Sequence, residues 1–206
     1  MKKEGLNKRK LRAIETKSKI YKTARKLVLE HGFENVSVDS IVNAAGVSKG
    51  TFYLHFESKD ALAAALVEEY TSTTDMGYKS FLTSLHDHNS IFETLTLLAE
   101  KIAEFTATNV GLENIRVLYR AHLAKTINTT PAMSYNRDLY KLFTEVLERG
   151  VQQSEIRQDI SVDSLSKHLI LAIRGITYDW CIRYPDFNLK EQILEHFNIL
   201  IYGLRK

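Results

Sequence analysis

The stretch from Ser37 to Lys59, SVDSIVNAAGVSKGTFYLHFESK, constrains the fold most, because it predicts two short helices joined by one tight turn. Apolar residues at the spacing of one helical face predict the first helix from Val38 to Ala45. Ser37 precedes this helix with a hydroxyl that can cap its free N–H groups. Gly46 follows it and supplies the positive φ that a sharp turn needs. A second helix is therefore expected to begin almost at once.

That second helix is predicted from Lys49 to about His55, with the Ser48 hydroxyl as its cap. Phe52 and Phe56 are four residues apart and would form its buried side. The residues left to face outward are small, basic or hydroxyl-bearing: Lys49, Gly50, Thr51, Tyr53 and His55. Such a helix fits the DNA major groove, where a threonine can contact a base edge or a thymine methyl and a glycine permits close backbone approach. The lysine, tyrosine and histidine can donate to phosphates.

Each of these residues also has an ordinary structural explanation, such as a turn glycine or a helix cap, and only their combination indicates DNA binding. The combination resembles the DNA-binding domain of the TetR family, bacterial transcriptional regulators that are mostly repressors. The resemblance covers about the first third of the chain and rests on Ala24-x-x-Leu27, Gly32-Phe33, Val36-Ser37-Val38, Ile41, Ala45-Gly46-Val47-Ser48, Gly50-Thr51-Phe52-Tyr53, His55-Phe56 and Ser58-Lys59-Asp60-x-Leu62.

The resemblance implies two groups of DNA contacts. The residues that would face bases are Lys49, Gly50 and Thr51. The residues that would hold the phosphate backbone are Ser37, Tyr53, His55 and Lys59. It also implies a small-molecule pocket among the later helices and a homodimer formed by the last two. The expected function is a repressor that a small molecule releases from its operator.

Basic charge is concentrated at the N-terminal end of the chain. Residues 1–60 hold 13 Lys and Arg against 7 Asp and Glu, a balance of +6, whereas residues 61–206 have a balance of −3. This asymmetry predicts a footprint for a polyanion on the N-terminal part. Residues 1–12 are expected to form a loose basic arm that follows phosphates or enters a minor groove. A first helix is predicted from about Ala13 or Thr16 to His31.

The rest of the chain has helical periodicity with clear start signals and no strand-like alternation. A fourth helix should begin at Ser58 and end between Thr74 and Leu85. Later helices are expected to start at a capping box, Ser90 to Glu93, at Thr130-Pro131, at about Val162 and at Asn188. The helix from Thr130 should end near Gly150, and Pro185 should stop the helix from Val162. We therefore predict an all-α protein with a DNA-binding domain at 1–58 and a helical ligand-binding and dimerisation domain at 59–206.

The last two predicted helices are apolar on more than one face, so each must be covered on two sides. With no further elements in the chain, this favours a partner subunit. A dimer also suits DNA recognition, because each base pair contributes only about 1–3 kcal/mol of discrimination. Two-fold symmetry doubles the contacts and predicts an inverted-repeat operator.

Candidate ligand-binding residues combine aromatic bulk with a few polar groups on helices with a buried pattern. They are Phe105, Arg116, Tyr119, His122, Tyr178, Trp180 and Cys181. The ordinary alternative is that the aromatics belong to the core and that Arg116 and His122 lie at a surface. The expected ligand is apolar or amphipathic, with an anion favoured if Arg116 faces inward.

Enzyme chemistry finds no support in the sequence, which lacks a Gly-rich phosphate loop, a nucleophile elbow and a metalloprotease helix motif. His86 and His88 point apart at their spacing if they are helical, so no metal or cofactor is expected. The single cysteine, Cys181, and the absence of a long apolar run or secretory signal favour the cytoplasm. The alternative function is a TetR-like protein that organises the chromosome or contacts proteins without a small-molecule inducer.

Overall fold

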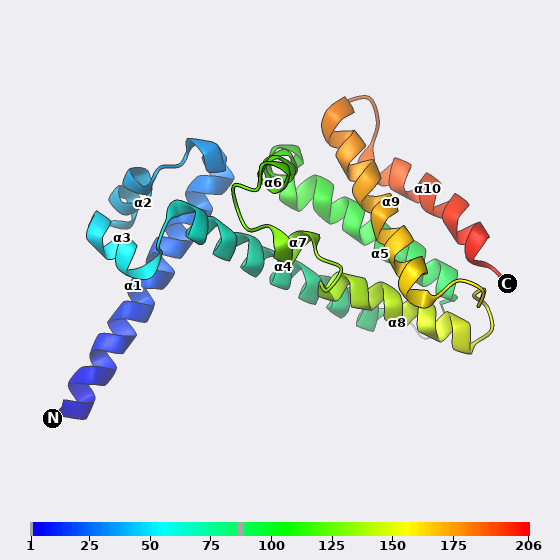
Figure 1. Cartoon of the computed structure of the whole chain (residues 1–206), viewed down its shortest axis with the longest axis horizontal. Coiled ribbons are helices and arrows are strands. Elements are labelled where there is room, and N and C mark those ends of the chain that lie inside the picture. Colours follow the sequence, from blue (N-terminus) through cyan, green and yellow to red (C-terminus); the bar gives the residue numbers. More distant parts are fainter. Residues whose placement is uncertain (1, 86–88) are drawn as a thin grey trace. The chain divides into compact units, whose positions relative to one another are not determined.

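The computed structural model describes residues 2–85 and 89–206, and the prediction of an all-α fold is confirmed (Figure 1). Over these residues β-structure is limited to an isolated bridge between Ile156 and Arg205. The α-helices are α1 (Lys2–His31), α2 (Val38–Ala45), α3 (Lys49–His55), α4 (Lys59–Ser84), α5 (Ile91–Phe105), α6 (Leu112–Ala124), α7 (Thr130–Met133), α8 (Asp138–Gln152), α9 (Val162–Arg183) and α10 (Leu189–Leu204). A 3-10 turn spans Phe33–Asn35, and a π-helical segment spans Thr106–Val110.

The chain divides into two compact units. The first, here called the N-terminal unit, comprises residues up to Glu69 together with 120–129. The second, here called the C-terminal unit, comprises 70–119 and 130–206. The expected domain boundary between residues 58 and 59 falls at the start of α4 and stays a prediction.

The N-terminal unit has a small core to which α1, α2, α3 and α4 all contribute. Its buried members are Ile20, Ala24, Val36, Ile41, Val42, Phe52, Phe56 and Leu62. Phe52 is fully buried and its ring centroid lies 5.8 Å from that of Phe56, so the predicted buried side of α3 is confirmed. This core fixes α3 to α1 and α2 through aromatic side chains on one face only.

The first helix is longer than predicted. It begins at Lys2, and the expectation of a loose arm before Ala13 or Thr16 was wrong. The physical reason is composition, because residues 2–12 consist mainly of Lys, Arg, Leu and Glu, which favour helices, with Gly5 as the one strong exception. Charge alone does not unwind such a segment.

The C-terminal unit is a helical bundle in which α10 packs against α5 and α9, and α8 packs against α5 and α9 (Figure 1). Its core includes the fully buried side chains Leu95, Leu98, Phe143, Leu147 and Phe197. The predicted capping box is present, since Ser90 and Glu93 each accept a backbone N–H of the other. α4 ends at Ser84, inside its predicted range, and Asn188 caps α10 as expected.

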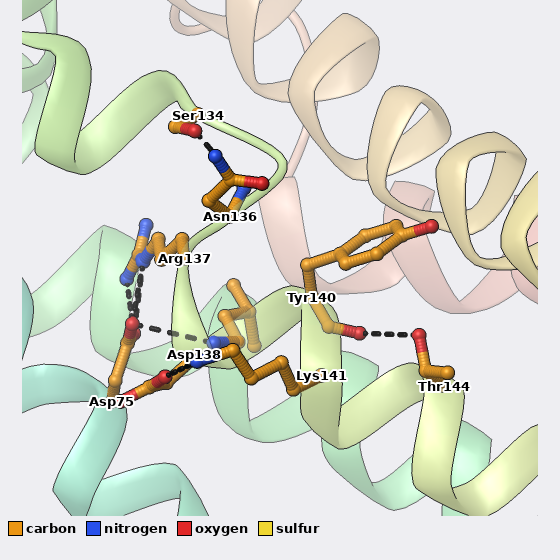
Figure 2. Close-up of polar contacts among 9 residues, drawn as sticks. Asp75, Ser134, Asn136, Arg137, Asp138, Tyr140, Lys141 and Thr144 are labelled. Carbon is orange, nitrogen blue, oxygen red and sulfur yellow. Dashed lines mark hydrogen bonds and ion pairs between the residues drawn. The ribbon is translucent and has the colours of Figure 1, made fainter.

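The segment after Thr130 departs from the prediction. A helix does start at Thr130, but it ends at Met133, and a separate helix begins at Asp138. The break is stabilised from another part of the chain: the Asp75 carboxylate on α4 accepts the Leu139 N–H at 3.3 Å and two Arg137 Nε contacts at 2.8 and 3.0 Å (Figure 2). An acid at the start of α8 also complements the helix dipole.

Candidate nucleic-acid interface

The start of α2 is fixed by two reciprocal hydrogen bonds. The Ser37 hydroxyl accepts the Ser40 N–H at 3.0 Å, and the Ser40 hydroxyl accepts the Ser37 N–H at 3.0 Å. The cap at Ser37 is confirmed, whereas the role of Ser40 was missed. Its signal is weak, because the usual partner in this position is Glu or Gln.

The turn between α2 and α3 depends on Gly46, which has φ 61° and ψ 41°. In this left-handed conformation the Gly46 N–H donates to Asn43 and the Val47 N–H donates to Val42 at 3.0 Å, so the last carbonyls of α2 are satisfied. Ser48 then accepts the Thr51 N–H at 3.1 Å and caps α3. Three residues thus separate two helices, as the sequence predicts.

The outward face of α3 lies opposite Phe52. At 100° per residue, Gly50 and Leu54 lie farthest from Phe52 around the helix, and both are exposed. Leu54 is 83% exposed and Tyr53 is 50% exposed, which is unusual for large apolar or aromatic side chains on so short a helix. Leu54 was missed because an apolar residue is normally assigned to a core, although its angular position on the helix indicates the surface.

Lys49, at the first position of α3, is paired with Asp39 on α2. Its ammonium nitrogen lies 2.9 Å from Asp39 Oδ1 and 3.1 Å from Oδ2. The hydrogen bond to Asp39, with the charge of that carboxylate, raises the pKa of Lys49. Both side chains are exposed, so the pair lies at the surface that carries the other outward residues of α3.

The remaining predicted DNA contacts have definite positions as well. The Lys59 ammonium lies 4.2 Å from the Phe33 ring centroid, in a cation–π contact at the start of α4. His55 is half-buried at the end of α3, and the Thr51 hydroxyl lies 2.8 Å from the Ser48 hydroxyl. The seven residues for which the resemblance implies DNA contacts, and Ser48 as an eighth predicted contact, all belong to the N-terminal unit, and their individual DNA contacts stay predictions.

Residues 20–66 match the family model for bacterial regulatory proteins of the tetR family. This N-terminal segment of the chain therefore carries the tetR-family sequence pattern. The match contains the whole of α2 and α3 with the Gly46 turn, so the resemblance seen in the sequence is confirmed. The matched segment has the helix-turn-helix geometry that the sequence predicts for such a regulator.

Several regulators are similar to this chain over most of its length. The HTH-type transcriptional repressor KstR2 of Rhodococcus jostii is 26% identical over 140 residues, 68% of this chain and 67% of its own. A tetR-family regulator structure from Mesorhizobium loti has a TM-score of 0.75 at 16% identity, over 95% of this chain and 99% of that one. The regulator FadR of Bacillus subtilis, solved with stearoyl-CoA, has a TM-score of 0.68 at 19% identity, over 91% of this chain and 99% of that one.

Six of the seven predicted ligand-binding residues belong to the C-terminal unit, and His122 belongs to the N-terminal unit. Arg116 and Tyr119 on α6 meet α9, where Arg116 donates to the Cys181 carbonyl at 2.9 Å and the Tyr119 ring lies 5.4 Å from Tyr178. Phe105 lies beside Tyr70 and Tyr78, with ring centroids 6.1 and 6.0 Å away, and packs against the same core as Tyr119. The imidazole of His122 lies 2.6 Å from the Thr129 hydroxyl, in the N-terminal unit. Trp180 is buried in the core of the C-terminal unit.

A hollow of about 430 Å³ lies on the surface of α9 and α10. Its lining residues are Gly175, Ile176, Asp179, Arg183, Asp186, Phe187 and Gln192. None of these belongs to the predicted ligand set, and two of the acids, Asp179 and Asp186, pair with Arg183 across it at 3.8 and 3.3 Å. The ligand-binding assignment therefore stays a prediction.

Two further expectations concern membranes and metals. Across the residues that the structure describes, every helix is too short or too polar to cross a bilayer. His86 and His88, considered above as a metal pair, lie outside the described residues.

Proposed function

We propose that this tetR-family regulator is a cytoplasmic, dimeric repressor that binds an inverted-repeat operator and leaves it when a small molecule binds the C-terminal unit. The observation that carries the proposal is α3: a seven-residue helix held by two aromatic side chains on one face, with a glycine, a threonine and a lysine on the surface. A helix anchored from behind in this way can enter the major groove without losing its position.

Support for the dimer comes from exposed apolar side chains on the last two helices. On α9, Leu171, Tyr178 and Ile182 recur at intervals of seven and four residues, with Gly175 between them, and all are exposed. On α10, Ile199 and Tyr202 are three residues apart and also exposed. A seam of this spacing is suited to helix–helix packing, and a second copy would cover it.

The dimer can be tested by placing a charge in this seam. Ile182→Asp should shift the protein from dimer to monomer in sedimentation experiments and weaken binding to a full operator far more than binding to a half-site. Leu123→Asp is the matched control, because Leu123 is equally exposed but lies on α6. A wild-type protein that is monomeric at concentrations where it binds DNA would refute the dimer.

Support for the ligand comes from the aromatic side chains where α6 meets α9. Tyr119 and Tyr178 pack edge to face there, and Trp180 and Cys181 follow Tyr178 within the next turn of α9. We favour an apolar or amphipathic ligand, and stearoyl-CoA, the molecule bound to FadR, is the first probe. Trp180 is the only tryptophan, so saturable quenching of its fluorescence and release of operator DNA would support this class. Unchanged fluorescence and DNA binding would exclude long-chain acyl thioesters.

The DNA-binding proposal is tested by selecting bound sequences from random duplex DNA. We expect an inverted repeat, and we expect Gly50→Glu with Thr51→Glu to abolish selection while thermal unfolding is unchanged. The matched control is Thr73→Glu with Gly77→Glu, which adds the same charges to an exposed stretch of α4. Undiminished selectivity of the α3 variant would refute the proposal, and many weak sites in place of one operator would favour chromosome organisation.

A further inference from the structure

The helix-turn-helix neutralises its own lysine. Between residues 37 and 56 the chain contains one carboxylate, Asp39, and one lysine, Lys49. The structure pairs them: the ammonium lies 2.9 and 3.1 Å from the two carboxylate oxygens, and it joins the first turn of α2 to the first residue of α3. The family resemblance suggests that Lys49 faces bases, yet in the free protein this cation already has a partner.

A pair in this position has opposite consequences on different DNA sequences. On arbitrary DNA, a phosphate that attracts Lys49 must compete with Asp39 and leaves the carboxylate facing a polyanion, which is unfavourable. On a site that presents guanine O6 and N7 to Lys49, two directed acceptors compensate for the lost partner. Discrimination between sites is a difference of affinities, so a penalty confined to the wrong sites increases it.

We propose that Asp39 is a specificity-determining residue that holds Lys49 away from phosphates and releases it only to a suitable base pair. The inference rests on the DNA-binding function proposed above. It assigns a role to an acid that the basic footprint of the N-terminal unit would not predict. Asp39 acts through Lys49 and is therefore a positioning residue, with no DNA contact of its own required.

The test compares wild type and Asp39→Asn on the sequence selected from random DNA and on a scrambled duplex. Asp39→Asn should bind the scrambled duplex more tightly at low salt, by about two- to fivefold for each reading helix, the range expected when one exposed ion pair is removed. The slope of log affinity against log salt on that duplex should steepen by about one for each reading helix, and so by about two for the dimer, because each helix contacts one more phosphate. The ratio of the affinity for the selected sequence to the affinity for the scrambled duplex should fall.

Two controls separate the pair from bulk charge and from helix stability. In a Lys49→Gln background, Asp39→Asn should change neither the salt slope nor the affinity ratio, because the ammonium that it frees is absent. Asp60→Asn removes an acid from the first turn of α4 and controls for net charge and for the loss of a favourable helix-dipole interaction. Asp39→Ser repeats the test with a smaller side chain, in case Asp39→Asn does not fold.

The outcomes are distinguishable. If wild type selects no sequence, the proposed function and this inference both fail. If wild type selects a sequence but Asp39→Asn leaves the ratio and the slope unchanged, only the inference fails. An effect of equal size in the Lys49→Gln background would also overturn it, because the carboxylate would then act by repulsion from DNA and not through Lys49.

Discussion

The ion pair between Asp75 and Arg137 should be the most sensitive polar contact in the C-terminal unit. Asp75 is only 4% exposed, and its carboxylate receives Arg137 Nη2 at 2.7 Å, Arg137 Nε at 2.8 and 3.0 Å and the Leu139 N–H at 3.3 Å (Figure 2). The Arg137 side chain is 17% exposed and also donates to the Ala132 carbonyl at the end of α7. One carboxylate thus fixes the α7–α8 connection to α4.

The perturbation is Asp75→Asn, which keeps the shape and an oxygen acceptor for Leu139 but leaves Arg137 uncompensated. Breaking a buried pair by removing one partner costs about 3–5 kcal/mol. Because Arg137 retains some access to water, we expect the lower end, about 3 kcal/mol. In a thermal experiment on a chain of this size, that loss corresponds to a fall in Tm of about 6–12 °C.

The assay is urea unfolding followed by Trp180 fluorescence, because this single buried tryptophan reports on the C-terminal unit alone. Asp138→Asn is the matched control: it removes an exposed acid that pairs with Lys141 at 2.6 Å, and the midpoint should hardly move. Asp75→Asn combined with Arg137→Gln should cost less than the sum of the two single changes. A loss below about 1 kcal/mol for Asp75→Asn, or strict additivity, would refute the reasoning.

Three further predictions follow from burial and backbone conformation. Gly46→Ala should destabilise the N-terminal unit by about 1–2 kcal/mol, because the φ of Gly46 is +61°. Gly77→Ala, in an exposed helix interior, should instead stabilise α4. Thermal unfolding followed by circular dichroism compares the two variants, and equal effects would contradict the turn assignment. Burial raises the pKa of the Cys181 thiol, so it should resist a thiol reagent until urea unfolds the chain, and rapid reaction at neutral pH would contradict this. Burial raises the pKa of Tyr119 to about 12, above its unfolded value of about 10, so its contribution to stability is complete below pH 10 and is lost as the pH rises toward 12. Tyr119→Phe should reduce the loss of stability between about pH 10 and pH 12. An unchanged dependence of stability on pH would contradict this role of Tyr119.

The helix-turn-helix was predictable because nearly all of its determinants are local. Ser37, Gly46 and Ser48 each act on backbone groups within five residues, and the pair Phe52 and Phe56 is set by helical spacing. A sequence pattern contains such information directly. What it missed, the Lys49–Asp39 pair, joins two helices across the turn, and no rule of spacing on one helix contains that contact.

The α7–α8 break shows the opposite case. Thr130-Pro131 is a valid start signal, and the apolar spacing that follows is compatible with one continuous helix to Gly150. The decisive contact comes from Asp75, more than sixty residues away, and it terminates one helix and starts the next. Gly150, in the last turn of α8, has no room for a side chain, because a Cβ there would lie 2.4 Å from Ile156 Cγ1 and 3.0 Å from Ile91 Cγ2. The contact with Ile91, too, comes from a distant part of the chain.

The predicted ligand residues also have partners that the sequence does not reveal. Arg116, chosen as a possible anion contact, satisfies its guanidinium with the Cys181 carbonyl at 2.9 Å and the Glu113 carboxylate at 2.8 Å. Arg174, which was not chosen, lies half-buried over the Tyr135 ring at 5.2 Å, and burial lowers its pKa. Which arginine can meet an anion depends on what each already binds, and that is a property of packing between helices. A pattern on one helix identifies polar groups, but only the assembled bundle determines which of them are already engaged.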